Sequence, residues 1–213
     1  MFIQAIPSGP FSTNAYVVAC AEMHEAAIVD PAPDSAAAIV EYLSAHQLIP
    51  KKILLTHSHW DHIAEVKSLK DRFHIPVYVH PLDAPNLQKP GADGLPCWLR
   101  ITGVEPDGFF EEGEQFPVGK LNFQILHTPG HSPGSVCFYE PQQGVLISGD
   151  TLFKGTIGNL SFPTSQPSLM WSSLEKLERL PSNTRVYPGH GPATTIKEES
   201  RLLREARSLF DLE

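Results

Sequence analysis

The sequence has few cysteines and few basic residues. Its three cysteines, Cys20, Cys97 and Cys137, form no CxxC pair, so they indicate neither a disulfide framework nor a thiolate zinc site, and a reducing compartment is expected. Lys and Arg together number only 16, and the formal net charge is −8. A nucleic-acid surface must neutralise phosphates with basic groups, so no nucleic-acid partner is expected.

The sequence also lacks a long apolar run. Residues 1–7 have neither the basic flank nor the apolar segment of a secretory signal, and no stretch approaches the roughly 18 apolar residues of a membrane helix. We therefore expect a soluble, cytoplasmic protein without a membrane partner. With 213 residues, 41% of them hydrophobic, the chain can bury its own core, and residues 1–213 are expected to form a single domain. The sequence does not indicate an oligomeric state.

Hydrophobic periodicity predicts a β-meander followed by alternating strands and helices. The predicted strands are short and lie at residues 2–6, 15–19, 26–29, 52–55, 77–80, 121–126, 136–139, 145–147 and 186–187. The predicted helices lie at residues 35–45, from His62 to about 73, at 168–180 and at 196–212. Asp34 is expected to cap the first of them. Because strands and helices recur in two comparable halves, two sheets packed face to face with helices outside are expected.

The densest cluster of functional side chains is the seven-residue segment from Thr56 to His62, which holds three imidazoles and a carboxylate. Zn, Fe and Mn share these ligand types, and such a cluster makes little sense in a hydrophobic core. In an extended backbone residues i and i+2 point the same way, so His57 and His59 are expected to converge on one ion. Asp61 and His62 lie at the turn into a helix and are aimed differently. The segment therefore predicts two adjacent ions.

Three later residues of ligand type each follow an apolar strand. They are His131 in Thr-Pro-Gly-His-Ser-Pro-Gly, Asp150 in Ser-Gly-Asp-Thr, and His190 in Pro-Gly-His-Gly. The flanking glycines and prolines fix an unusual backbone and permit a close approach to an ion. Together with the first segment, they predict one metal centre assembled from distant parts of the chain.

These four elements resemble those of the metallo-β-lactamase superfamily, in order and over nearly the whole chain. The HxHxDH motif of that superfamily is matched by His57, His59, Asp61 and His62. The resemblance implies an α/β fold, a four-layer αβ/βα sandwich of two mixed sheets with helices outside and metals at one edge. It also implies two divalent ions, with Zn²⁺ expected and Fe or Mn as alternatives. One ion would be held by His57, His59, His131 and Asp150, and the other by Asp61, His62, His190 and again Asp150.

Within the superfamily, residues 148–153, 157–158 and 188–192 most resemble the glyoxalase II (hydroxyacylglutathione hydrolase) branch in its short, single-domain form. The resemblance implies hydrolysis of a small-molecule thioester, in which hydroxide formed between the two ions attacks the carbonyl and Asp61 orients it. A leaving thiolate with a pKa of about 8.5 needs no strong general acid. Common zinc β-lactamases differ in carrying Cys where Asp150 stands and in being exported.

The loop after Asp150 departs from the glyoxalase II pattern. Asn159-Leu160-Ser161-Phe162-Pro163 stands where basic and tyrosyl groups for the glutathione carboxylates are expected, and Lys154 is the only cation nearby. Weak selectivity for glutathione is therefore expected. An alternative is a mononuclear iron persulfide dioxygenase, with iron on His57, His131 and Asp150, and another is a different hydrolase of the same fold. The role of the Pro-rich stretch from Pro81 to Asp107 stays open.

Overall fold

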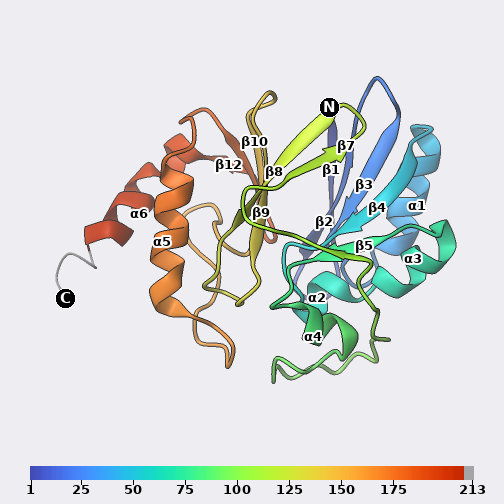
Figure 1. Ribbon diagram of the computed structural model, residues 1–213, viewed down its shortest axis with the longest axis horizontal. Helices are drawn as coiled ribbons and strands as arrows, with labels where there is room; N and C mark the ends of the chain where they lie inside the picture. The colour runs from blue at the N-terminus through green and yellow to red at the C-terminus, as the bar shows by residue number, and fades with distance from the viewer. Residues whose placement is uncertain (209–213) are drawn as a thin grey trace.

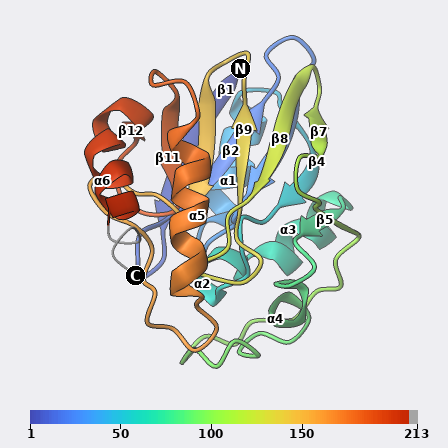
Figure 2. The same cartoon turned by 60° about the vertical axis from the view of Figure 1, so that its left-hand side comes forward.

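Two six-stranded sheets pack face to face, and helices cover both outer surfaces (Figures 1 and 2). The structure is a computed structural model that describes residues 1–208, with residues 205–208 described as backbone only. In the part of the chain so described, no helix is both long and apolar enough to cross a membrane.

The first sheet contains β1 to β6 in sequence order. Its strands are β1 Phe2–Ser8, β2 Thr13–Ala19, β3 Glu25–Val29, β4 Ile49–Leu54, β5 Val77–Val79 and β6 Gly108–Phe109. The antiparallel pairing of β1, β2 and β3 confirms the predicted meander, and from β3 onward neighbouring strands are parallel. The helices of this half are α1 Ala36–Ala45, α2 Trp60–Ile63, α3 Val66–Phe73 and α4 Ala84–Gln88.

The second sheet has the order β12-β11-β10-β9-β8-β7. Its strands are β7 Gln115–Val118, β8 Leu121–His127, β9 Val136–Glu140, β10 Val145–Gly149, β11 Arg185–Pro188 and β12 Thr194–Thr195. Only the β10–β11 pair is parallel among the described strands of this sheet. The helices of this half are α5 Pro167–Glu178 and α6 Ile196–Ser208.

Three apolar clusters hold the four layers together. In β3, side chains alternate between faces, so Ile28 packs outward under α1 and α3 while Val29 packs inward between the sheets. Phe138 of the second sheet belongs to the same inner cluster. A third cluster joins the outer face of the second sheet to α5 and α6 through Leu174 and Leu203. The predicted four-layer sandwich is therefore confirmed.

The predicted cap of the first helix is wrong. Asp34 has a positive φ of 63° and lies outside the helix. The N-cap residue is Ser35, which makes no side-chain capping bond because its hydroxyl donates to the Ala32 carbonyl, 2.7 Å away. This backward bond closes the turn between β3 and α1.

Several element boundaries also differ from the prediction. The helix after His62 is interrupted between α2 and α3, and the Pro-rich stretch from Pro81 to Asp107 contains the short helix α4. The strands β6, β7 and β12, of two, four and two residues, were not predicted. The predicted end of the last helix, residues 209–212, lies outside the described residues.

Candidate metal centre

Strand direction gathers the seven predicted residues at one edge of the sandwich. In the second sheet β8, β10 and β11 run the same way, and His131, Asp150 and His190 follow their carboxyl ends. The segment from His57 follows the end of β4 in the first sheet, beside α2 (Figure 1). Ligand sites in open α/β sheets commonly form outside the carboxyl ends of strands.

Hydrogen bonds join the two sheets at this edge. The amide of Val136 donates to the Thr56 carbonyl over 2.8 Å, and the amide of Asn14 donates to the Gly189 carbonyl over 2.7 Å. The side-chain amide of Asn14 also donates to the Pro188 carbonyl at 2.9 Å. The segments that carry the candidate ligands are therefore fixed relative to one another by backbone bonds.

The first cluster consists of three buried imidazoles, those of His57, His59 and His131. One nitrogen of each lies within 4.8 Å of the others. The Nδ1 of His59 is 2.9 Å from the Nε2 of His131. As the sequence predicts, His57 and His59 converge, and His131 lies beside them, as the family resemblance implies.

The second cluster consists of Asp61, His62 and His190, whose ligand atoms also lie within 4.8 Å of one another. Asp61 Oδ2 is 3.5 Å from His62 Nε2 and 3.4 Å from His190 Nε2. His62 is fully buried, while the His190 side chain is 25% exposed. This cluster is the more open of the two to solvent.

Asp150 lies between the clusters. Its Oδ2 is 3.4 Å from both His131 Nε2 and His190 Nε2, and its Oδ1 is 3.5 Å from His62 Nε2. Gly189 makes this position possible, because a Cβ on that residue would lie 2.1 Å from Asp150 Oδ1. Gly189 is therefore needed to leave space for the Asp150 carboxylate, in addition to its place in the turn before His190.

The two clusters differ in charge. Burial lowers the pKa of His57 and brings the pKa of His59 down to about 3, so both imidazoles are neutral. Burial also opposes protonation of His62 and His190, but the carboxylates of Asp61 and Asp150 outweigh it and raise their pKa values to about 9 and about 10. Burial acts to raise the pKa of Asp150, yet the surrounding imidazoles lower it to about 2.

Unpartnered buried atoms show that the donor set fits metal ions. Among the described residues, His57 Nε2, His62 Nε2 and Asp150 Oδ1 are buried without a hydrogen-bond partner. Buried polar atoms normally have partners, so atoms left bare at the meeting point of two clusters indicate that a further group belongs there. Imidazole nitrogen and carboxylate oxygen are ligands of Zn, Fe and Mn.

Two further buried residues orient the clusters and were missed in the sequence. Asp30 accepts hydrogen bonds from the Thr56 amide at 2.7 Å and from His62 Nδ1 at 3.0 Å. Thr13 donates to Asp61 Oδ2 at 2.7 Å. Asp30 directly follows β3, so it carries the same signal, a polar residue after an apolar strand, that identified Asp150. Thr13 has no comparable signal.

A cavity of about 340 Å³ opens over both clusters. Beside the candidate ligands, its lining residues are Phe11, Trp60, Leu95, Phe153, Asn159 and Phe162. The ring of Phe162 packs on His59 and His131, with centroids 5.4 Å from each. Trp60 also packs on Trp98, with centroids 5.0 Å apart. None of the described residues lining this cavity is Lys or Arg.

Comparison with known proteins identifies the family. A model described as the metallo-beta-lactamase superfamily matches residues 8–190, and the chain belongs to that superfamily. The probable metallo-hydrolase YqgX of Bacillus subtilis (strain 168) is 35% identical over 197 residues, covering 91% of this chain and 92% of that protein. The hydroxyacylglutathione hydrolase GloC of Haemophilus influenzae is 34% identical over 208 residues, covering 94% and 96%.

Two solved structures extend the comparison. The B3 metallo-beta-lactamase BLEG-1 superposes with a TM-score of 0.88 at 39% identity, covering 95% of this chain and 99% of that chain. TTHA1623, solved in a di-iron-bound form, gives a TM-score of 0.81 at 39% identity, covering 93% and 97%. The His and Asp clusters are consistent with a dinuclear metal site in this superfamily.

Proposed function

We propose that this protein is a metal-dependent hydrolase that uses two divalent ions to cleave thioesters, in the manner of a hydroxyacylglutathione hydrolase. The observation that carries the proposal is the pair of donor clusters that share Asp150 beneath an open cavity. The likeness to GloC along nearly the whole chain supports the thioester as substrate.

The donors divide between the ions as follows. One ion would be held by His57, His59, His131 and Asp150, and the other by Asp61, His62, His190 and Asp150. We assign zinc to both positions, because imidazole and carboxylate donors suit it. The di-iron form of TTHA1623 makes iron the alternative. Elemental analysis of protein purified from metal-replete cells tests both the identity and the number of ions.

Bound divalent ions lower the pKa of water toward neutrality and polarise a carbonyl group. The protein supplies orientation. The Asp61 carboxylate is held ionised, since His62, His190 and Thr13 lower its pKa against the opposing effect of burial. It lines the cavity and can accept a hydrogen bond from an attacking water. We therefore assign Asp61 as the residue that orients the nucleophile.

The cavity favours a good leaving group. The titratable side chains that line it, His59, Asp61, His131, Asp150 and His190, are all candidate ligands. No lining residue among those described is thus left to protonate an amine. A thiolate leaves without such help because its conjugate acid has a pKa of about 8.5.

The cavity does not favour glutathione in particular. Its apolar lining carries no Lys or Arg among the described residues to pair with the carboxylates of the tripeptide. Charge-assisted contacts of that kind commonly contribute about 1.5 to 3 kcal/mol each. We expect less than a tenfold difference in kcat/KM between S-lactoylglutathione and the lactoyl thioester of N-acetylcysteamine, which lacks those carboxylates.

Hydrolysis of β-lactams is the second candidate, and the likeness to BLEG-1 favours it. Assaying a chromogenic β-lactam beside the two thioesters separates the candidates. Turnover of the β-lactam with both thioesters inert would replace the thioester proposal. A thousandfold preference for the glutathione thioester would instead contradict the weak selectivity. A single iron per chain with oxygen consumption would favour the persulfide dioxygenase.

A further inference from the structure

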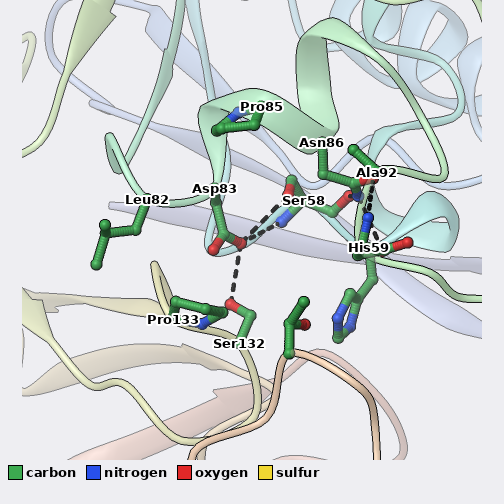
Figure 3. Close-up of a pocket in the computed structure, with 11 residues that line it drawn as sticks. Ser58, His59, Leu82, Asp83, Pro85, Asn86, Ala92, Ser132 and Pro133 are labelled. Carbon is green, nitrogen blue, oxygen red and sulfur yellow. Dashed lines mark hydrogen bonds between the residues drawn. The ribbon is translucent and has the colours of Figure 1, made fainter.

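A buried carboxylate outside the two clusters contacts both loops of the first cluster. Asp83 immediately precedes α4, yet its side chain makes no capping bond to that helix, and the residue is only 3% exposed. Figure 3 shows the carboxylate turned away from α4 toward Ser58 and Ser132. These two serines lie on different loops, next to candidate metal ligands.

The first loop is bound through Ser58, which stands between His57 and His59. Asp83 Oδ2 accepts the Ser58 amide at 2.8 Å and the Ser58 hydroxyl at 3.3 Å. The amide bond fixes the backbone at the point where the chain turns from one imidazole to the next. The position of this hydrogen bond therefore affects how closely the His57 and His59 imidazoles converge.

The second loop is bound through the residues after His131. Asp83 Oδ2 accepts the Ser132 hydroxyl at 2.9 Å, and Asp83 Oδ1 accepts the Gly134 amide at 2.6 Å. A Cβ on Gly134 would lie 2.5 Å from Asp83 Oδ1, so the approach requires glycine. One carboxylate thus links the loop of His57 and His59 to the loop of His131.

All four hydrogen bonds to the Asp83 carboxylate come from neutral donors. Burial raises the pKa of Asp83, and the bonds from Ser58, Ser132 and Gly134 oppose that rise. Removing the acceptor would leave buried donors without partners, which typically costs about 1 to 3 kcal/mol for each. The two loops would then lose the hydrogen bonds that hold them together.

The imidazole of His59 has the greatest need of such support. The other four candidate imidazoles use Nδ1 to contact a neighbour: Thr56 Oγ1 at 3.1 Å, Asp30 Oδ2 at 3.0 Å, the Asn159 carbonyl at 2.9 Å and the Phe11 carbonyl at 3.1 Å. The distal Nε2 of His59 is buried and has no partner among the described residues. Its orientation therefore depends on its backbone and on packing.

We propose that Asp83 is a positioning residue that sets the separation of the two histidine loops and so preorganises the three-histidine side of the metal centre. The inference rests on the proposed dinuclear function. Partners that orient a metal ligand typically change metal affinity tenfold to a hundredfold when removed. The effect should be selective, because the hydrogen bonds of the Asp83 carboxylate go to Ser58, Ser132 and Gly134 and not to the residues of the second cluster.

The test is a chelator-competition titration of Asp83→Asn, made once in the otherwise wild-type chain and once in a chain that also carries His190→Ala. The His190→Ala chain should retain only the ion at the three-histidine cluster, so its affinity is measured there alone. We expect that ion to bind tenfold to a hundredfold more weakly and the other to change less than threefold. Glu140→Gln is the matched control, because Glu140 is also a buried carboxylate that accepts a backbone amide, that of Gln143 at 2.6 Å, but it lies at the end of β9 and contacts neither histidine loop through that bond. It should leave both affinities within threefold of wild type.

If Asp83→Asn binds each ion as tightly as wild type does, the inference is overturned while the proposed function stays intact. An equal loss at both ions would also overturn it, since a general loss of stability gives that result. If Asp83→Asn does not fold, Ser132→Ala replaces it, because it removes one of the four donors. A smaller loss of affinity at the three-histidine ion would support the inference, and no loss would overturn it. Wild-type protein that binds no metal would overturn the proposed function and this inference together.

Discussion

The three-histidine cluster and the Asp61, His62 and His190 cluster lie side by side but are supported in different ways. The first is built from buried imidazoles, two of them with lowered pKa values, and offers a cation little attraction at a distance. The second holds a carboxylate between two imidazoles whose pKa values are raised to about 9 and about 10. It therefore attracts positive charge, whether protons or a metal ion.

This difference separates two ways of preparing a metal site. A cluster made of imidazoles alone depends on geometry, so the bonds that hold its loops matter most. A cluster that contains a carboxylate also depends on the field of that carboxylate, so the groups that keep it ionised and oriented matter most. Asp150 belongs to both arrangements, since it contacts imidazoles of each cluster.

The largest effect is expected from Asp150→Asn. Loss of the shared carboxylate should weaken both ions and lower kcat/KM for a thioester by at least about a hundredfold, beyond the tenfold to hundredfold typical of a partner that only orients a ligand. Metal content and kcat/KM are the measurements. His190→Ala is the comparison variant and should release mainly one ion. Retention of both ions by Asp150→Asn would show that the clusters are independent.

A smaller effect is expected from Thr13→Val. The Thr13 hydroxyl donates to Asp61 from a fully buried position, so its removal should weaken the ion at the second cluster by roughly tenfold and leave the three-histidine ion unchanged. Chelator competition measures both affinities. Thr13→Ser keeps the hydroxyl and should behave as wild type. Equal losses in the two variants would exclude the hydrogen bond as the cause.

The fold was predictable from sequence wherever a periodic pattern was long enough. The seven-residue strand β2 and the helices α1 and α5 appear where periodicity places them. The strands β6 and β12, of two residues each, could not be predicted, because they form only when a neighbouring strand is already in place. The predicted cap of α1 was wrong for a local reason, since the turn after β3 places Asp34 outside the helix.

The candidate ligands were predictable because their spacing and their position after strands carry the signal. The structure brings all seven together, although they span residues 57 to 190. Two of their supporting partners, Asp83 and Thr13, could not be predicted in the same way. Asp83 contacts Ser132 across 49 residues, and Thr13 contacts Asp61 across 48, so only the folded chain makes these pairs visible.

The smallest effect is expected from an imidazole outside both clusters. His80 stacks on His127, with centroids 4.1 Å apart, and burial together with that neighbouring ring lowers the pKa of His80 to about 4. An unfolded histidine has a pKa of about 6.5, so the unfolded state binds more protons between these values. The contribution of His80 to stability is therefore complete above pH 6.5 and is lost as the pH falls toward 4.

The pKa values of His62 and His190 are raised, whereas that of His80 is lowered. In metal-free protein their contributions to stability therefore change with pH in opposite directions. Because His80 is only half-buried, solvent screening reduces its expected contribution to about 1 kcal/mol. Chemical unfolding of wild type and His80→Gln in excess chelator, at pH 7 and pH 4.5, measures it. Wild type should lose about 1 kcal/mol more than the variant, since Gln cannot titrate while both clusters are common to the two proteins. Equal losses would mean that the pKa of His80 is not lowered in the folded protein.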